Sequence, residues 1–371
     1  MKIGREYLPP YIFRDFLGSS AFVCAEEGWR HVLVATGLWV YHEDGSILSF
    51  DSESVPFAIL RALSERPASI SSVLQAFGDC VSAVLVELWV AKLIYISDRS
   101  DAINGSGNAI RFCWLEEYLK RYSGAGLTPN GMIGRLREAT VCIVGLGGLG
   151  SMLALSLSAS GVGCLKLVDG DVVEESNLSR QIIYRESDIG KCKVHALADV
   201  ITANNSCTEI KMINRFVESA SDAAEALQGC NFVVLCADQP RFKIKGWIGQ
   251  ASLDQKVPLM TMAGQWVGPV SDPFKSPCYA CIARLHGAQF SDAPGLINSQ
   301  CQSATPPRGS FGPRPLILAG QISAVVIHYL TGIDKETPLH RRFRISMFGD
   351  FEEEKMIRYK DCRACGSQVT S

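Results

Sequence analysis

The spacing of apolar residues changes character near Thr140. Beyond that point, short apolar runs typical of buried strands alternate with longer segments of helical periodicity. The predicted strands are 140–144, 164–168, 208–213, 231–236 and 258–262, and the predicted helices run to Ser160 and over 191–203 and 241–255. This alternation predicts an α/β fold, with a doubly wound, Rossmann-like and mainly parallel sheet that carries helices on both faces.

The last part of the chain continues this domain. Residues 294–315 are rich in proline and glycine and predict a long loop, a feature that is usually functional or mobile. A helix over 316–330 and two strands near 343–348 and 354–358 are expected to close the domain.

The first hundred residues show a different pattern. Three short strand-like runs precede three helical segments, and Glu43-Asp44-Gly45 supplies a hairpin turn. The third helical segment places Val81, Val84, Leu88 and Ala91 on one stripe, which is a core-facing spacing. The predicted strands are 32–34, 38–41 and 47–50, and the predicted helices are 55–63, 70–77 and 81–93. We predict a small α+β winged-helix module over 1–100, a polar, glycine-rich linker over 101–110 and a larger domain over 111–371.

Composition narrows the classes of function. The chain has 371 residues, 47% of them hydrophobic and 20% charged, which suits two folded domains better than a disordered protein. The formal net charge of −2 lacks the basic excess of nucleic-acid-binding proteins, so no nucleic-acid partner is predicted. We find neither a signal-peptide pattern nor an apolar run of about 20 residues, so we expect a cytoplasmic protein with no membrane partner.

A glycine-rich loop follows the first predicted strand of the larger domain. Gly145, Gly147 and Gly150 have the G-x-G-x-x-G spacing that lets backbone N–H groups and a helix N-terminus approach a phosphate. Asp169 ends the next predicted strand, where a carboxylate can hold ribose hydroxyls. By themselves, these features also fit a dinucleotide-dependent dehydrogenase.

Polar residues beyond Asp169 favour a triphosphate over a dinucleotide. The segment from Asn177 to Gln181 is Asn-Leu-Ser-Arg-Gln, and Lys193 follows in Gly-Lys-Cys-Lys. Three phosphate groups need cations and amides to offset their charge, whereas hydride transfer has no use for them. Asp238 ends another predicted strand at the same edge of the sheet, where its carboxylate can hold Mg²⁺. The sequence therefore predicts ATP and Mg²⁺ as ligands.

In this order, the motifs resemble the adenylating family of MoeB, ThiF and the ubiquitin-activating enzymes, over roughly residues 110–366. The resemblance implies that Arg180, Lys193 and Asp238 are catalytic residues, acting on the phosphates and on Mg²⁺ while a carboxylate attacks the α-phosphate. It also implies a homodimer. The nucleotide-binding residues predicted on this basis are Gly145, Gly147, Gly148, Gly150, Asp169, Asp171, Asn177, Arg180, Gln181, Lys193, Asp238 and Arg111.

The chain departs from this family before the first strand. Relatives carry Arg-Tyr-x-Arg-Gln there, and the second arginine reaches the ATP of the neighbouring subunit. The segment here is Arg111-Phe112-Cys113-Trp114-Leu115. Arg111 can stand for the first arginine, but Trp114 occupies the position of the second, which puts an arginine supplied in trans in doubt.

Two Cys-x-x-Cys pairs stand apart among the 14 cysteines, most of which are scattered through apolar segments as expected of buried thiols. Cys278 with Cys281 and Cys362 with Cys365 can form the closed four-thiolate shell of a structural zinc ion. A redox role is the alternative, and two such pairs match zinc better. Cys301 lies in the predicted long loop without an activating neighbour, and we interpret it as a passive thiol.

The module over 1–100 distinguishes the chain from MoeB and ThiF proteins, which begin close to the nucleotide fold. It resembles PqqD-like modules, in which a leader peptide adds a strand to an open sheet edge beside the third helix. A packing cap with no ligand is the alternative. With this module, the architecture resembles the peptide-antibiotic branch of the family, represented by PaaA and MccB.

We therefore predict ATP-driven activation of a carboxylate in a precursor peptide, with PaaA-like activation of a glutamate followed by ring closure. Three alternatives remain. The first is MccB-like adenylation of a peptide C-terminus, and the second is adenylation of a sulfur-carrier protein that ends in Gly-Gly. The third is a non-catalytic scaffold, against which the retention of Arg180, Lys193 and Asp238 speaks.

Overall fold

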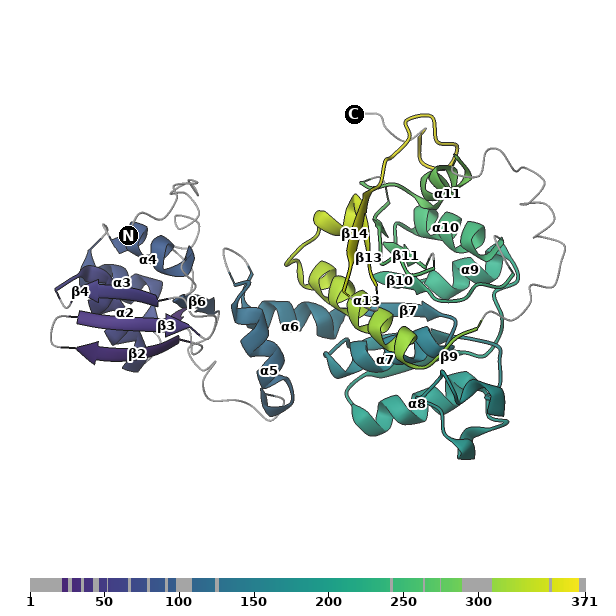
Figure 1. The fold of residues 1–371 in the computed structure, drawn as a ribbon, viewed down its shortest axis with the longest axis horizontal. Coiled ribbons are helices and arrows are strands. Elements are labelled where there is room, and N and C mark those ends of the chain that lie inside the picture. Colours follow the sequence, from purple (N-terminus) through teal and green to yellow (C-terminus); the bar gives the residue numbers. More distant parts are fainter. Residues whose placement is uncertain are drawn as a thin grey trace. The chain divides into compact units, whose positions relative to one another are not determined.

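The chain divides into two compact units, Met1–Gly134 and Arg135–Ser371, drawn as a ribbon in Figure 1. The structure is a computed structural model. It describes residues 22–25, 29–34, 37–42, 47–51, 53–65, 68–78, 81–90, 93–97, 109–123, 127–240, 243–262, 264–273, 275–288, 309–346 and 349–366. Among these, every helix is too short or too polar to span a bilayer.

The first unit contains two small antiparallel sheets. One has the order β2-β3-β4 and the other the order β5-β1-β6. The strands are β1 (Phe22–Ala25), β2 (Trp29–Val34), β3 (Gly37–His42), β4 (Ile47–Asp51), β5 (Ala68–Ser69) and β6 (Ile94–Ser97). The helices are α2 (Val55–Glu65), α3 (Ile70–Phe77), α4 (Val81–Val90), α5 (Ala109–Lys120) and α6 (Pro129–Glu138), the last of which crosses into the second unit.

The helices α2, α3 and α4 occur where the apolar spacing predicts them. Val81, Leu85 and Leu88 of α4 are buried in one apolar cluster with residues of α2 and α3, as expected of a core-facing stripe. Ala91 and the predicted hairpin turn at 43–45 lie outside the described residues. The apolar pattern did not predict β1, β5, β6, α5 or α6, and α5 begins at Ala109, inside the stretch assigned to the linker.

The second unit is built on a six-stranded sheet with the order β12-β11-β10-β7-β8-β9. Five strands, from β11 to β9 in this order, run parallel to one another, and β12 at the edge is antiparallel to β11. This arrangement confirms the predicted mainly parallel sheet. The strands are β7 (Thr140–Val144), β8 (Cys164–Val168), β9 (Glu209–Ile213), β10 (Phe232–Leu235), β11 (Leu259–Thr261) and β12 (Val270–Ser271).

Helices lie on both faces of this sheet. On one face, Cys142 and Val144 of β7 pack against α9 and α10 in a single buried cluster. On the other, Ile143 points toward α7, which packs in turn against α8 and α13 (Figure 1). The helices are α7 (Gly148–Ala159), α8 (Lys193–Asn204), α9 (Ala220–Leu227), α10 (Lys243–Gln255), α11 (Tyr279–Ala288) and α13 (Pro313–Thr331).

The order of the strands reverses beside β7. From β7 the chain continues to β8 and β9 on one side of the sheet, and then returns to β10 and β11 on the other. In a parallel sheet, such a reversal leaves a crevice beyond the carboxyl ends of the strands. The crevice here lies beyond the ends of β7 and β10, which are joined at its base because the backbone N–H of Ala237 donates to Val144 O at 2.8 Å.

The last part of the unit differs from expectation in where its elements begin. The helix α13 starts at Pro313, inside the predicted loop, because proline fits the first turn of a helix well. The hairpin of β13 (Arg341–Ile345) and β14 (Phe351–Lys355) lies a few residues before the predicted strands. Residues 289–308, with Cys301, lie outside the described part of the chain. The helices α9 and α11 and the short strand β12 were not predicted.

We expect Gly150→Ala to destabilise the second unit, because a Cβ at this position would lie 1.9 Å from Gly145 O. Overpacking of this kind costs about 1–3 kcal/mol or more. The matched control is Gly320→Ala in α13, where a Cβ meets nothing within 4 Å and should stabilise the helix by about 0.5–1 kcal/mol. Thermal unfolding of the two full-length variants tests this, and an unchanged melting temperature for Gly150→Ala would contradict it.

Candidate functional site

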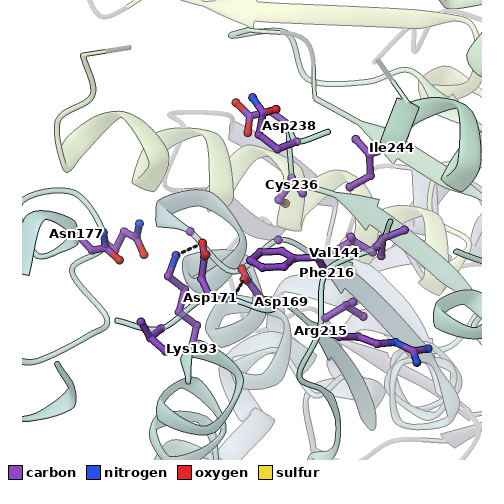
Figure 2. A pocket seen from close by; sticks show the side chains of 18 of the residues that line it. Val144, Asp169, Asp171, Asn177, Lys193, Arg215, Phe216, Cys236, Asp238 and Ile244 are labelled. Carbon is purple, nitrogen blue, oxygen red and sulfur yellow. Dashed lines mark hydrogen bonds and ion pairs between the residues drawn. The ribbon is translucent and has the colours of Figure 1, made fainter. Parts of the chain in front are cut away.

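A cavity of about 370 Å³ lies at the reversal point of the sheet, and Figure 2 shows its lining side chains. The loops that follow β7, β8, β9 and β10 all contribute to it. Nine of the predicted nucleotide-binding residues line this cavity: Gly145, Gly147, Asp169, Asp171, Asn177, Arg180, Gln181, Lys193 and Asp238. The fold therefore brings together residues that are spread over more than ninety positions in the sequence.

The glycines of the loop after β7 do two different things. Gly145 has φ +93°, and a Cβ there would lie 2.5 Å from Ala237 N, so both its conformation and its surroundings require glycine. Gly148 and Gly150 do not line the cavity. A Cβ on Gly148 would lie 2.8 Å from Arg180 O, and one on Gly150 would collide with Gly145. These two residues serve close packing of α7.

The carboxylate of Asp169 is held by the backbone on both sides. Its Oδ2 accepts from Leu146 N at 2.6 Å, and its Oδ1 accepts from Asp171 N at 2.8 Å. The residue is 9% exposed and lies at the floor of the cavity. Each carboxylate oxygen has a second lone pair, so Asp169 can still accept hydrogen bonds from a ligand in the cavity.

Lys193 contributes a buried ammonium group to the lining of the cavity. It lies at the first position of α8, its side chain is 6% exposed, and its Nζ lies 2.8 Å from Oδ2 of Asp171 (Figure 2). Asp171 itself is 53% exposed. A buried ammonium is costly unless it is paired, and the Asp171 pair leaves further Nζ hydrogens to donate to an anion.

The turn before α8 supplies amides and a second cation. Asn177 is buried, and its Oδ1 accepts from Glu174 N at 3.3 Å, which caps the short helix Glu175–Asn177. Arg180 donates to Ser176 O at 2.7 Å and lines the cavity. Gln181 is also buried, and its Oε1 has no hydrogen-bond partner within the described structure.

The loop after β10 closes the opposite side. Asp238 is exposed and lines the cavity. Beside it, burial raises the pKa of the Cys236 thiol to about 12, so this thiol stays protonated at neutral pH. Among the described lining residues Cys236 is the one cysteine, and this part of the lining therefore offers no thiolate nucleophile.

Sequence analysis missed several lining residues. Arg215 and Phe216 follow β9, and Ile244 lies in the first turn of α10. Tyr184, which is buried and not part of the lining, was also missed: its hydroxyl donates to Leu146 O at 2.7 Å and supports the loop after β7. Burial is the main cause of a raised pKa at Tyr184, and the negative charge of the nearby Asp169 carboxylate raises it further. The hydroxyl therefore stays protonated and can donate this hydrogen bond. The one sequence signal for the missed lining residues is that several of them follow the carboxyl ends of parallel strands.

Arg111 and Trp114 lie on α5, in the first unit. The cavity is lined by residues of the second unit. A contribution of Arg111 to nucleotide binding therefore stays a prediction.

A second candidate site is formed by the two Cys-x-x-Cys pairs. The four Sγ atoms of Cys278, Cys281, Cys362 and Cys365 all lie within 4.8 Å of one another, and all four residues are buried. The separations are 3.9 Å for Cys278–Cys281, 3.7 Å for Cys278–Cys362 and 3.7 Å for Cys281–Cys365. Four thiolates around zinc at about 2.3 Å would be about 3.8 Å apart. The geometry therefore fits a tetrahedral metal ion, and the distances are too long for disulfides.

The surroundings of these cysteines tie distant parts of the chain together. Cys278 and Cys281 lie at the start of α11, whereas Cys362 and Cys365 lie in the turn after β14. Tyr359 N donates to Cys281 Sγ at 3.5 Å, and Arg284 pairs with Asp361 at 2.8 Å. A metal at this place would fix the end of the described chain to α11.

A protein-family model described as the ThiF family matches residues 124–365 of the chain. The molybdopterin-synthase adenylyltransferase of Escherichia coli is 29% identical over 236 residues, which are 62% of this chain and 88% of that protein. The adenylyltransferase and sulfurtransferase uba4 of Aspergillus niger is 32% identical over 238 residues, 60% of this chain and 49% of that protein. The chain spans about half, or less, of the length of the uba4 proteins that it matches.

Solved structures share the fold over more of the chain. Escherichia coli MccB with ATP superposes with a TM-score of 0.69 at 21% identity, covering 93% of this chain and 100% of MccB. The selenomethionine form of PaaA gives a TM-score of 0.64 at 22% identity, with 90% and 100% covered. At these identities the likeness concerns the fold alone.

We expect Cys365→Ser to lose a tightly bound zinc ion and to lower the melting temperature, because a closed four-thiolate shell contributes directly to folding. Cys207→Ser is the control, since Cys207 is exposed and lies outside the cluster. Elemental analysis of the purified proteins measures the metal, and calorimetry measures unfolding. About one zinc per chain in the parent protein is expected. A parent protein without zinc, whose cysteines at 278 and 362 react freely with an alkylating agent, would refute the site.

Proposed function

The chain belongs to the ThiF family, and we propose that it is an ATP-dependent enzyme that activates a carboxylate as an acyl-adenylate. One observation carries the proposal. The cavity at the reversal point gathers a glycine loop, a backbone-anchored aspartate, two cationic side chains and an exposed aspartate on the loop opposite. This set of groups matches the successive parts of a magnesium-bound nucleoside triphosphate.

The cavity fits ATP in size and in the chemistry of its donors. Its volume of about 370 Å³ lies within the usual range of ligand pockets. In this proposal Asp169 holds the ribose hydroxyls, and this is supported by the backbone hydrogen bonds that fix both its oxygens while lone pairs remain. Gly145 and Gly147 line the cavity, so the backbone of this loop can approach a phosphate there.

The reaction we propose forms and breaks one bond at the α-phosphorus. An oxygen of the substrate carboxylate bonds to it, and the bond to the oxygen that bridges to the β-phosphorus breaks, so pyrophosphate leaves. Lys193 and Arg180 offset negative charge on the phosphates, and Asn177 holds the turn that carries Arg180. The described lining offers no thiolate that could act as the nucleophile in place of the substrate carboxylate. The protein therefore contributes positioning and charge stabilisation.

Mg²⁺ belongs beside Asp238 in this scheme. Among the described residues, the four cysteines form the one group of three or more His, Cys, Asp or Glu close enough to share an ion. An ion at Asp238 would therefore take its remaining ligands from phosphate oxygens and water, as Mg²⁺ commonly does. When bound, it neutralises charge on the leaving pyrophosphate.

We further propose that the activated carboxylate belongs to a ribosomally made precursor peptide recognised by the first unit. The family match begins at residue 124, so most of the first unit lies outside the matched region. We therefore assign its strands and helices a function of their own. MccB and PaaA cover 93% and 90% of the chain, and MccB has been solved in complex with N-formylated MccA. Within the described sheet, β2 pairs on one side with β3, which leaves an edge where a peptide strand can add.

A second candidate substrate is a sulfur-carrier protein. It is favoured by sequence relatives such as the sulfur carrier protein adenylyltransferase of Thermus thermophilus, 29% identical over 268 residues. A partner of this kind would present its own C-terminal carboxylate to the same cavity and would have no need of the first unit. The peptide substrate therefore predicts that changes in that unit slow the modification, whereas the carrier-protein substrate predicts no change. PaaA-like ring closure, and the homodimer, are finer predictions within the first proposal.

Lys193→Met should weaken Mg·ATP binding about 10- to 100-fold and abolish turnover, because a charge-assisted hydrogen bond to phosphate is lost. The fold should survive, since Asp171 is half exposed and can be hydrated. Lys191→Met is the matched control: it lies two residues away, is 50% exposed and pairs with Asp188. Calorimetry with ATP and with NAD tests both variants. NAD binding more tightly than ATP to the parent protein would overturn the proposal.

Glu87→Lys on α4 should weaken modification of the precursor peptide without changing ATP affinity. Glu87 is exposed on the third helix, beside which a leader peptide would lie. Gln75→Lys on α3 is the control, with the same new charge on another exposed position. Mass spectrometry of a candidate peptide incubated with enzyme, ATP and Mg²⁺ gives the rate. Equal rates for all three proteins would leave the first unit as a packing cap and favour the carrier-protein substrate.

A further inference from the structure

Phe216 is an aromatic side chain left open to the cavity. It lies three residues beyond the end of β9 and lines the cavity wall, yet it is 53% exposed. Figure 2 shows its ring above Asp169, on the side of Val144. A phenylalanine exposed to this extent contributes little to the core, and exposed apolar surface inside a ligand pocket commonly meets the ligand.

The backbone around Phe216 is shaped to hold the ring in this place. A Cβ on Gly170 would lie 2.7 Å from Phe216 N and 2.8 Å from Cδ2 of its ring. Gly170 directly follows Asp169, so the ring packs on the backbone that carries the aspartate. The next residue, Val217, is buried in the core against α9 and α10 and anchors the segment.

The neighbouring charge is directed elsewhere. Arg215 is bound in an ion pair with Glu225, with Asp222 at 3.9 Å. Both acids belong to α9. The Arg215 guanidinium is therefore engaged with α9 and not with the ring of Phe216. Beside Asp169, the cavity wall presents an aromatic surface rather than a cation.

The position of Asp169 fixes which part of a nucleotide meets this ring. If its carboxylate holds the ribose hydroxyls, the phosphates extend toward Gly147 and Lys193. The base then lies on the other side of the ribose, where the lining is apolar: Val144, Val168, Phe216, Val217 and Ile244. An aromatic ring at this place can stack on the flat face of a purine.

We propose that Phe216 is the base platform of the nucleotide site, a specificity-determining residue that stacks on the purine ring of ATP, and that Gly170 makes room for it. This inference rests on the proposed function. It assigns to one exposed side chain the base-stacking part of the affinity that separates a nucleoside triphosphate from a bare polyphosphate, in addition to the part that Asp169 supplies at the ribose.

The test compares ATP with inorganic tripolyphosphate, each with Mg²⁺, by calorimetry on the full-length protein. Phe216→Ala should weaken ATP binding about 5- to 150-fold, the range for loss of one aromatic–base stack. The affinity for tripolyphosphate should not change. Phe216→Trp should retain ATP affinity, because the larger ring still stacks. Phe351→Ala, at a phenylalanine 61% exposed on β14 and outside the cavity lining, is the matched control and should bind as the parent does.

Three results would overturn the inference. ATP affinity unchanged in Phe216→Ala would show that the ring does not meet the base. Equal loss of both ligands would mean that the substitution damages the site as a whole. A parent protein that binds ATP no better than tripolyphosphate would have no base site. These outcomes leave the proposed function standing, whereas a parent protein that binds neither ligand overturns both.

Discussion

The nucleotide site depends first on the two hydrogen bonds that the Asp169 carboxylate accepts from the backbone. One comes from Leu146 in the glycine loop after β7, and the other comes from Asp171 beyond β8. A buried carboxylate is tolerated only when its oxygens are satisfied, so these bonds let a charge lie at the floor of the cavity. They also join the loops that follow two adjacent strands. The buried Tyr184 hydroxyl adds a third tie, to Leu146 O.

A second constraint connects the cavity to the cysteine cluster through one helix. Ile244, near the start of α10, lines the cavity, and Leu253, near its end, packs on the four cysteines. Between them, Gly249 leaves space for the ring of Tyr279, which would otherwise lie 2.2 Å from a Cβ there. A structural zinc would therefore stiffen the far end of an element whose near end forms part of the nucleotide site. Its contribution is to the placement of α10, at a distance from the chemistry.

Much of the second unit follows from local patterns in the sequence. The apolar runs of β7, β8 and β10 are buried along their length and are the strands that the sequence predicts best. The order of the motifs after them was sufficient for the family resemblance, which the family match over residues 124–365 confirms. The short helix α9 was missed although Ser219 caps it, with Asp222 N donating to its hydroxyl at 3.1 Å. Eight residues give too short a run for the apolar spacing to establish a helix.

The residues that were missed in the cavity share a physical reason. A side chain has a local signal when its neighbours in sequence are also its neighbours in space, as in the glycine loop. Phe216 and Arg215 follow β9, an edge strand whose end was predicted correctly, but no local pattern shows that the residues after it face the cavity. Their place in the cavity is set by the parallel pairing of β9 with β8, which brings the ends of both strands to one edge. Gly148 and Gly150 show the reverse case, because their motif suggests ligand contact while the fold uses them to pack α7 against the loop. Which members of a motif touch a ligand is therefore decided by tertiary packing, and the sheet register has to be known before the base-binding wall can be identified.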